Sequence, residues 1–386
     1  MFGFIVGQQM ITRWDNVTKY EMTPPGVFTS ESAARDSFIV TADDRILITG
    51  AAGFIGSRVV ERLLEHGFRN LVCFARPSSE VQEIETIVKR RPAGTRIEMF
   101  KGNLLSREDC EAAIKDVAVI LHLAAGTGEK SFPDAYMNSV VATRNLLDAS
   151  LRRTRLRRFV LVSSFTVYAN RWKPRGRLLD ESCPLEEHPE LRGDAYCFAK
   201  VKQEELVAEY GKNHGIPYVV IRPGSVYGGS KSQITGRVGL GTFGLFLHLG
   251  GSNTIPFTYV DNCAEAIALA GIVEGVEGEA FNVVDDDLPS SRQFLREYKK
   301  NVRPFKSVYV PHALSHVLCY LWEKYSNWSG GQLPPVFNCG RWHAEWKKTR
   351  YSNEKLKAKL SWTPKVPTPE ALRRYFQNSK QSERNA

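Results

Sequence analysis

The stretch ILITGAAGFIGSR, residues 46–58, sets three glycines between an apolar run and a helix-like repeat. The apolar run over 45–49 predicts a short buried strand, and the apolar residues of 59–64 recur at helical spacing. A glycine turn between a strand and a helix lets the backbone approach a pyrophosphate, which the free N–H groups of the helix can bind. The stretch favours a phosphate-binding turn, although a tight turn without a ligand also fits the glycines taken alone.

Strand-like and helix-like stretches alternate along the chain after this turn. The alternation favours an α/β fold, in which a doubly wound parallel sheet carries helices on both faces. After residue 224 the pattern becomes irregular, with a further helix predicted at 261–273 and a strand at 281–284. The regular strands are predicted at 45–50, 70–76, 97–103, 117–125, 158–164 and 218–224, and the helices between them at 56–66, 80–91, 106–115, 134–153 and 194–214.

The bulk composition is that of an ordinary folded protein, with 386 residues, 42% of them hydrophobic and 24% charged. No apolar run reaches the length of about 18 residues that a transmembrane helix needs, and the first residues lack the features of a signal peptide. The seven cysteines show no metal-ligand spacing. We therefore expect a cytoplasmic protein without a bound metal.

The formal net charge is +10, and part of it lies in LRRTRLRRF (151–159) and RWHAEWKKTR (341–350). A basic surface can attract nucleic acid, an anionic membrane or a phosphorylated substrate. The chain shows no nucleic-acid-binding motif, so no nucleic-acid partner is expected. A solvated basic surface is the favoured interpretation, and an anionic membrane or substrate is the alternative.

Two further elements carry chemistry. Tyr196 and Lys200 stand four residues apart and share one helix face, where a lysine ammonium would lower the pKa of the phenol. A tyrosine so tuned can exchange a proton with a hydroxyl or ketone near neutral pH. Ser163 and Ser164 end the strand predicted at 158–164, at the sheet edge where ligands bind in such folds. Each element alone is weak, because surface pairs and turn-forming serines are common.

Together, the glycine turn, the strand-end Ser164 and the Tyr-x-x-x-Lys of 196–200 resemble the extended short-chain dehydrogenase/reductase family, in its NAD-dependent epimerase/dehydratase branch. The resemblance covers roughly residues 45 to 375. Further marks are HLAA (122–125), RPGSVYG (222–228) and TYVDNCAEA (258–266). The family implies a Rossmann-type doubly wound parallel sheet with a smaller C-terminal substrate lobe.

The resemblance also implies roles for individual residues. Ser164 would orient the reacting oxygen, Tyr196 would be the general acid/base, and Lys200 would bind the nicotinamide ribose. Asn103 stands where the family usually has an aspartate, and Ala169 where it usually has a glycine. The residues expected to contact the dinucleotide are Gly50, Gly53, Phe54, Ile55, Gly56, Arg76, Asn103, Leu104, Leu123, Ala124, Ala125, Tyr196, Lys200, Pro223 and Ser225.

The end of the second predicted strand selects the cofactor. A carboxylate there binds the ribose 2′-OH of NAD, whereas an arginine accommodates the 2′-phosphate of NADP. Residues 73–79 read CFARPSS, and no carboxylate occurs before Glu80. Arg76 with its serines favours NADP, with NAD possible, because an arginine can also stack on the adenine of either cofactor.

The domain organisation follows from the same resemblance. Residues 1–43 are polar and aperiodic, and we expect an N-terminal extension that could be disordered. An NAD(P)-binding Rossmann domain with the catalytic residues is expected over 44–230, and mainly a substrate-binding lobe over 231–375. Some segments of that lobe would return to the sheet. Residues 376–386 are expected to be a polar tail.

The substrate is harder to predict. Relatives that act on nucleotide sugars often carry an arginine just upstream of the segment matched by TYVDN, and this chain has Thr254-Ile255-Pro256 there. The chain is more similar to the 3β-hydroxysteroid dehydrogenase and dihydroflavonol reductase branch. We expect an NAD(P)-dependent oxidoreductase that transfers a hydride at a secondary alcohol or ketone of a bulky, apolar substrate. One alternative is a nucleotide-sugar epimerase or dehydratase with tightly bound NAD(P), in which Arg237 or Lys231 replaces the arginine. The other is a non-catalytic dinucleotide sensor.

Two predicted helical surfaces concern the binding partners of the protein. The helices predicted at 106–115 and 134–153 could form the four-helix contact of a homodimer, which we expect. Residues 310–328 predict a helix with one apolar stripe, for which packing on the protein's own core is favoured over a lid on the substrate or a peripheral membrane contact. The stripe comprises Leu314, Val317, Leu318, Leu321, Trp322 and Tyr325.

Overall fold

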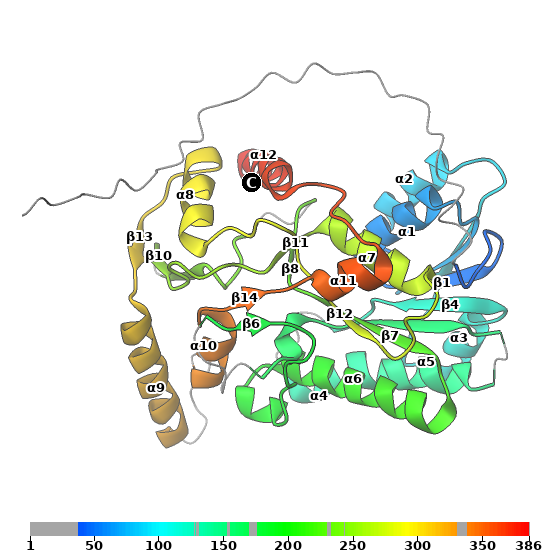
Figure 1. Ribbon diagram of the computed structural model, residues 1–386, viewed down its shortest axis with the longest axis horizontal. Coiled ribbons are helices and arrows are strands. Elements are labelled where there is room, and N and C mark those ends of the chain that lie inside the picture. Colours follow the sequence, from blue (N-terminus) through cyan, green and yellow to red (C-terminus); the bar gives the residue numbers. More distant parts are fainter. Residues whose placement is uncertain are drawn as a thin grey trace, which may run out of the picture. The chain divides into compact units, whose positions relative to one another are not determined.

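A seven-stranded parallel sheet forms the centre of the computed structural model (Figure 1). The strand order is β12-β7-β5-β4-β1-β2-β3, which reverses direction beside β1 as a doubly wound sheet does. The strands are β1 (Arg45–Thr49), β2 (Asn70–Ala75), β3 (Arg96–Lys101), β4 (Val117–His122), β5 (Arg158–Val162), β7 (Tyr218–Pro223) and β12 (Ala280–Val283). The structure describes residues 38–385 except 127, 129–130, 153–154, 170–175, 230–232, 243 and 330–337.

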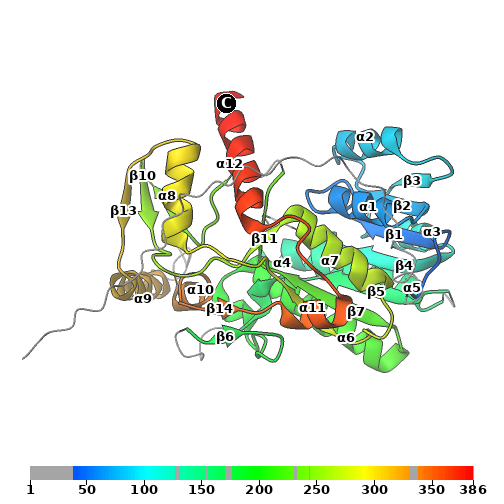
Figure 2. The same cartoon turned by 45° about the horizontal axis from the view of Figure 1, so that its top comes forward.

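Helices cover both faces of this sheet, as Figures 1 and 2 show. Because β1, β4 and β5 are almost entirely buried, each face needs an apolar helix layer. One layer contains α1 (Gly56–Glu65), α2 (Gln82–Arg90), α7 (Val260–Ile272) and α11 (Glu354–Leu360). The other contains α3 (Arg107–Ala113), α4 (Phe132–Ala135), the π-helix η2 (Tyr136–Val141), α5 (Ala142–Ser150) and α6 (Ala195–His214).

The remaining elements lie beyond the carboxyl ends of the strands. An aromatic cluster that includes Phe257, Phe294 and Tyr375 forms the core of this lobe. Two 3₁₀ turns, η3 (Phe165–Val167) and η4 (Pro189–Arg192), lead into it. Its small sheets are β9 (Gly239–Thr242), β10 (Leu245–His248) and β13 (Ser307–Tyr309); β8 (Ser225–Tyr227) with β11 (Phe257–Tyr259); and β6 (Leu178–Leu179) with β14 (Arg350–Tyr351). Its helices are α8 (Ser291–Asn301), α9 (His312–Trp328), α10 (Cys339–Glu345) and α12 (Thr368–Asn385).

The predicted strands and helices of the sheet are confirmed, with differences at the ends of the chain. Phe38 forms a β-bridge with Val273, so the folded part begins before the expected boundary at residue 43. The expected polar tail over 376–386 instead continues helix α12 to Asn385, because Phe376 and Ser379 are buried against the lobe. Residues 1–37 of the expected extension lie outside the described part.

Two expectations about the surface are wrong. Arg158, predicted to belong to a solvated basic patch, is fully buried; its guanidinium donates to the carbonyls of Ala270 and Val273 and pairs with Glu277. The apolar stripe of 310–328 was expected to pack on the core, and α9 turns it outward. Leu314, Val317, Leu318, Leu321 and Tyr325 are each about half exposed.

No helix in the described part of the chain is long and apolar enough to cross a membrane. Among the same residues, no group of three or more His, Cys, Asp or Glu side chains is placed to hold a metal ion.

Candidate active site

The turn between β1 and α1 is built for close backbone approach. Gly50 has a φ of +71°, and the N–H of Gly53 donates to its carbonyl over 2.9 Å. A Cβ on Gly56 would lie 2.1 Å from that same carbonyl oxygen, and a Cβ on Gly50 would lie 3.1 Å from the backbone nitrogen of Ala124. The turn therefore excludes side chains at both positions and leaves the start of α1 open to an anion.

A cavity of about 1130 Å³ runs along the carboxyl edge of the sheet from this turn. Its volume is of the order expected for a cofactor together with a small substrate. Each of the fifteen residues that the sequence predicts to contact a dinucleotide lines this one cavity, and so does Ser164. The structure thus brings together residues that are up to 175 positions apart in the sequence, from Gly50 to Ser225.

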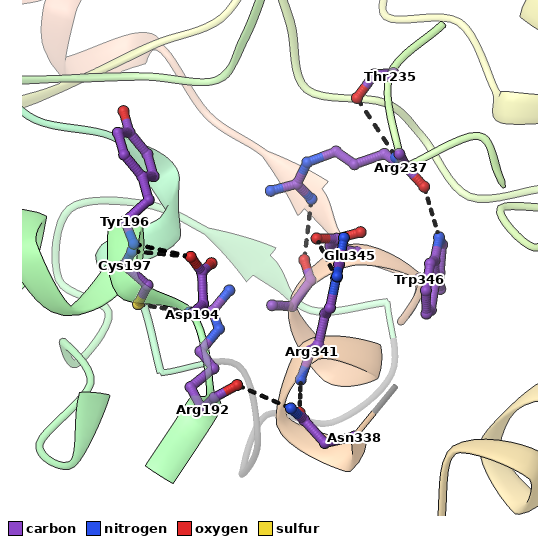
Figure 3. A network of polar contacts seen from close by, with 12 residues as sticks. Arg192, Asp194, Tyr196, Cys197, Thr235, Arg237, Asn338, Arg341, Glu345 and Trp346 are labelled. Atoms are coloured by element: carbon purple, nitrogen blue, oxygen red, sulfur yellow. Dashed lines mark hydrogen bonds and ion pairs between the residues drawn. The ribbon is translucent and has the colours of Figure 1, made fainter. Parts of the chain in front are cut away.

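Three elements place the catalytic side chains. Ser164 follows β5 and caps η3, where its hydroxyl accepts from the N–H of Thr166. Tyr196 lies in the first turn of α6, which Asp194 caps by accepting from the N–H groups of Tyr196 and Cys197 at 3.1 and 3.2 Å (Figure 3). Lys200 follows one turn later on the same helix.

Burial determines the ionisation of this group. It raises the pKa of Tyr196 to about 12, and a hydrogen bond with Ser164 acts in the opposite direction. The Lys200 ammonium donates to the carbonyl of Val162 over 2.7 Å, and its nitrogen is 5.9 Å from the centre of the Tyr196 ring. The expected lowering of the Tyr196 pKa by Lys200 is therefore not observed. Burial also lowers the pKa of Lys200 to about 8.

The sequence did not predict a buried series of hydrogen bonds behind the carboxyl edge of the sheet. His122, at the end of β4, makes hydrogen bonds of 2.8 and 2.9 Å with the hydroxyls of Thr49 and Thr143. Gln203 on α6 donates to the same Thr143 hydroxyl. Thr49 in turn accepts from the N–H of Ala124, a residue that lines the cavity. The motif HLAA was recognised, but a histidine inside an apolar strand gave no signal of these partners.

A second buried network was also missed. Arg222, just before the cavity residue Pro223, forms a bidentate pair with Glu204 on α6, with its shortest N–O distance at 2.6 Å. It also donates to the Tyr168 hydroxyl, which donates to Asn282 on β12. The network connects the helix that carries Tyr196 with two strands of the sheet.

The substrate side of the cavity is largely aromatic. Ile255, at the place where a diphosphate-binding arginine was expected for nucleotide-sugar enzymes, is buried in the aromatic cluster of the lobe. The cavity continues past Tyr196 to residues of several elements. They are Tyr227, Gln233, Ile234, Thr235, Gly236, Phe257, Phe294 and Tyr375.

Helix α10 connects the substrate loop with the loop before Tyr196 (Figure 3). At its start, Asn338 donates to the carbonyl of Arg192 over 2.9 Å. At its end, the carbonyl of Ala344 accepts from the guanidinium of Arg237 at 3.0 Å, and the indole of Trp346 donates to the carbonyl of Gly236. Lys231, the other cation considered for the substrate, lies outside the described residues.

The model of the NAD dependent epimerase/dehydratase family matches residues 46–283, most of the described sheet. The chain belongs to this family. The predicted family and the assignment as an NAD(P)-dependent enzyme of the extended short-chain dehydrogenase type are confirmed, and the seven-stranded parallel sheet confirms the Rossmann-type fold.

Curated relatives include enzymes of both substrate branches. A trifunctional UDP-glucose 4,6-dehydratase/epimerase/reductase of Arabidopsis thaliana is 27% identical over 62% of this chain and 36% of its own length. An uncharacterized UDP-glucose epimerase of Bacillus subtilis is 28% identical over 62% of this chain and 76% of its own. A 3β-hydroxysteroid dehydrogenase of Mycobacterium tuberculosis is 29% identical over half of each chain. Of these relatives, the Arabidopsis enzyme is much the longest, and this chain spans only about a third of it.

Solved structures share the fold. The UDP-glucuronic acid 4-epimerase of Bacillus cereus in complex with NAD is 21% identical, with a TM-score of 0.62 over 88% of this chain and 99% of that one. The UDP-glucose 4-epimerase of Thermus thermophilus in complex with NAD is 22% identical, with a TM-score of 0.60.

Proposed function

We propose that this enzyme transfers a hydride between a bound nicotinamide dinucleotide and a secondary-alcohol carbon of a nucleotide-activated sugar, as an epimerase or dehydratase. The observation that carries the hydride chemistry is the meeting of Ser164, Tyr196 and Lys200 with the glycine turn in one cavity. The UDP-sugar relatives support the substrate class. This reverses the order of the sequence-based expectations, in which an apolar substrate came first.

The residues present fit a dinucleotide. The Cβ-excluding turn at Gly50 and Gly56 and the open start of α1 would hold the pyrophosphate, and Lys200 would hold the ribose of the nicotinamide. When bound, the nicotinamide accepts or returns the hydride.

The protein's own groups move the proton. The Ser164 hydroxyl, which is hydrogen-bonded to Tyr196, would hold the reacting oxygen of the sugar within reach of the phenol. When the alcohol is oxidised, its hydroxyl proton passes to the Tyr196 oxygen, and when the ketone is reduced, the same proton returns. A Tyr196 pKa of about 12 makes the protonated phenol the resting form, which is the acid that reduction of the ketone requires.

The sugar diphosphate needs a cation, which Ile255 does not supply. Arg237 is the candidate, because it follows the cavity residue Gly236 and its side chain is only partly buried. In Figure 3 the guanidinium is directed to the side on which Tyr196 lies. Its hydrogen bond to the carbonyl of Ala344 leaves further N–H groups for a phosphate.

The cofactor that we propose is NADP, with NAD as the alternative. Arg76 and Ser79 line the cavity at the end of β2, where the 2′ substituent of the ribose would lie. Glu80 also lines this region, and its carboxylate would weaken the preference for a 2′-phosphate.

The test is to purify the enzyme, release any nucleotide from one portion by denaturation, and supply UDP-glucose, UDP-glucuronic acid and UDP-N-acetylglucosamine to the native remainder. We expect close to one NAD(P) per chain after gel filtration and conversion of at least one sugar. An Arg237→Met variant should raise the KM for that sugar by about tenfold or more and keep its nucleotide, because it loses a charged phosphate contact. Enzyme that arrives without nucleotide and leaves all three sugars unchanged contradicts the proposal.

A second candidate is a reductase with a dissociable cofactor and a bulky apolar substrate. The buried Ile255 and the aromatic residues Phe257, Phe294 and Tyr375 favour it, and so does the mycobacterial steroid dehydrogenase among the relatives. This candidate predicts NADPH consumption with hydrophobic ketones and no response to nucleotide sugars.

A further inference from the structure

We propose that helix α9 docks this enzyme on an anionic lipid surface. The helix has two opposite faces. One carries the exposed side chains Leu314, Val317, Leu318, Leu321, Tyr325 and Trp328, of which Trp328 is 81% exposed. At 1.5 Å per residue this face is about 21 Å long. Single exposed apolar residues are common on protein surfaces and need no explanation. A continuous exposed apolar stripe of this length, in contrast, marks an interaction site.

The opposite face holds α9 on the protein through small and polar side chains. His312, Ser315 and Cys319 are buried there, and the indole of Trp342 on α10 donates to the Ser315 hydroxyl over 2.8 Å. The carboxylate of Glu323 accepts from the N–H at the start of α10. The large apolar residues are therefore turned away from the body although the helix is firmly attached, which is the reverse of an ordinary surface helix.

Aromatic and basic residues flank the exposed stripe in the manner of an interfacial helix. Lys324 lies 5.6 Å from the centre of the exposed Tyr320 ring. Strand β13, which leads directly into α9 in Figures 1 and 2, exposes Val308 and Tyr309 next to the exposed Lys306. Tyrosine and tryptophan are favoured at the boundary between lipid and water, and lysines extend to the head groups.

Charge decides between a membrane and a second copy of the chain. Residues 299–350 contain nine lysines and arginines but only two acidic residues. Arg303 and Arg341 form ion pairs with Glu383 and Glu345, and the segment still holds an excess of positive charge. Two such surfaces would repel each other, whereas anionic lipid head groups attract them. Helix α9 is too short to span a bilayer, and polar residues such as Lys324 lie beside its apolar stripe. The helix would therefore lie in the plane of the lipid surface.

Docking would bring the substrate side of the cavity near the lipid. Helix α10 touches α9 through Trp342 and touches the cavity loop through Trp346, whose indole donates to Gly236. The proposal does not depend on which substrate the cavity takes, so vesicle binding can fail while the proposed activity stands.

The test is flotation of the full chain with vesicles of phosphatidylcholine, with and without phosphatidylglycerol. We expect binding to the anionic vesicles only, weakened by added salt. A Leu318→Ser/Leu321→Ser variant should lower the bound fraction by about tenfold or more, because it removes apolar area that enters the head-group layer. The control is Leu151→Ser, which changes a leucine of comparable exposure just after α5. Since all three leucines are about half exposed, the variants should keep the thermal midpoint of the wild type.

Wild-type protein that stays unbound with both kinds of vesicle overturns the proposal. So does a double variant that floats as well as the wild type. Light scattering that shows the double variant halving the mass of the wild type, without vesicle binding by either, would assign the stripe to a second copy of the chain.

Discussion

His122 is held neutral by its surroundings at the catalytic edge of the sheet. It lies between the hydroxyls of Thr49 and Thr143, and burial lowers its pKa to about 3. The histidine connects β4 with β1 and with the start of α5. It therefore supports the backbone at Ala124, which lines the cavity, without itself lining it.

The pKa of His122 makes the stability of the protein sensitive to acid. Because the folded-state pKa lies below the ordinary value of 6.5, the folded protein binds fewer protons than the unfolded chain between about pH 3 and 6.5. Stability is then lost as the pH falls from 6.5. Between about pH 7 and pH 5 the wild type should lose roughly 2 kcal/mol of unfolding free energy more than a His122→Gln variant.

Urea unfolding at the two pH values measures this difference. The control is His214→Gln, since His214 is exposed at the end of α6. Equal acid sensitivity of the wild type and His122→Gln would show that folding does not lower the pKa of His122.

Arg76 is the residue on which the cofactor preference rests. An Arg76→Asp change replaces a cation at the end of β2 with a carboxylate, which should repel a 2′-phosphate and accept from a 2′-OH. We expect NADPH to bind at least about tenfold more weakly and NADH to bind unchanged or more tightly. Fluorescence titration of nucleotide-free protein measures both affinities, with the exposed Lys89→Asp on α2 as control. A variant that still prefers NADPH would assign the preference to another residue.

At the scale of elements, the turn between β1 and α1 permits no side chain. A Gly56→Ala change would bring a methyl group to 2.1 Å from the Gly50 carbonyl oxygen and 2.8 Å from the Cα of Ala51. Both neighbours are backbone, so the turn itself must move. We expect a loss of about 1–3 kcal/mol of stability and a loss of nucleotide binding.

Differential scanning and nucleotide titration of Gly56→Ala measure the two effects. Gly241→Ala is the matched control, because a Cβ there meets open space. Nucleotide binding that survives in Gly56→Ala would mean that the pyrophosphate does not lie on this turn.

The sequence predicted site residues whose recognisable pattern lies within one helix, one turn or one strand end. Ser164, Tyr196 and Lys200 could be predicted because the strand end, the i,i+4 helix pair and the glycine turn are local patterns that together resemble the family. The strands of the lobe, which are two to four residues long, leave too short a pattern to recognise. His122 and Arg222 escaped notice because their partners come from distant elements.

Helix α9 shows most clearly what the spacing of apolar residues leaves undecided. The spacing of its apolar residues predicts an amphipathic helix, and that helix forms over His312–Trp328. The pattern alone does not tell which face turns inward. The contacts of Ser315 and Cys319 with α10 and its surroundings decide it, and they depend on Trp342, which lies far along the chain.

At the scale of the whole molecule, the sheet supplies a rigid edge and the lobe supplies the substrate side. The glycine turn, the end of β5 and the first turn of α6 meet only because the strand order reverses beside β1. The homodimer expected through α3 and α5 stays a prediction, and so does the cytoplasmic location. We propose that Tyr196 exchanges the proton of the substrate while a bound nicotinamide exchanges the hydride.

The most direct test of this role of Tyr196 is a single turnover followed by the absorbance of reduced nicotinamide. Wild type, Tyr196→Phe and the control Tyr210→Phe, which changes another tyrosine of α6, are each loaded with the oxidised cofactor and mixed with the sugar that the wild type converts. We predict a transient rise for the wild type and the control. The same step should be about a hundredfold or more slower in Tyr196→Phe, with equal nucleotide content in all three. A Tyr196→Phe variant that reduces its cofactor as fast as the wild type would show that Tyr196 is not the acid/base.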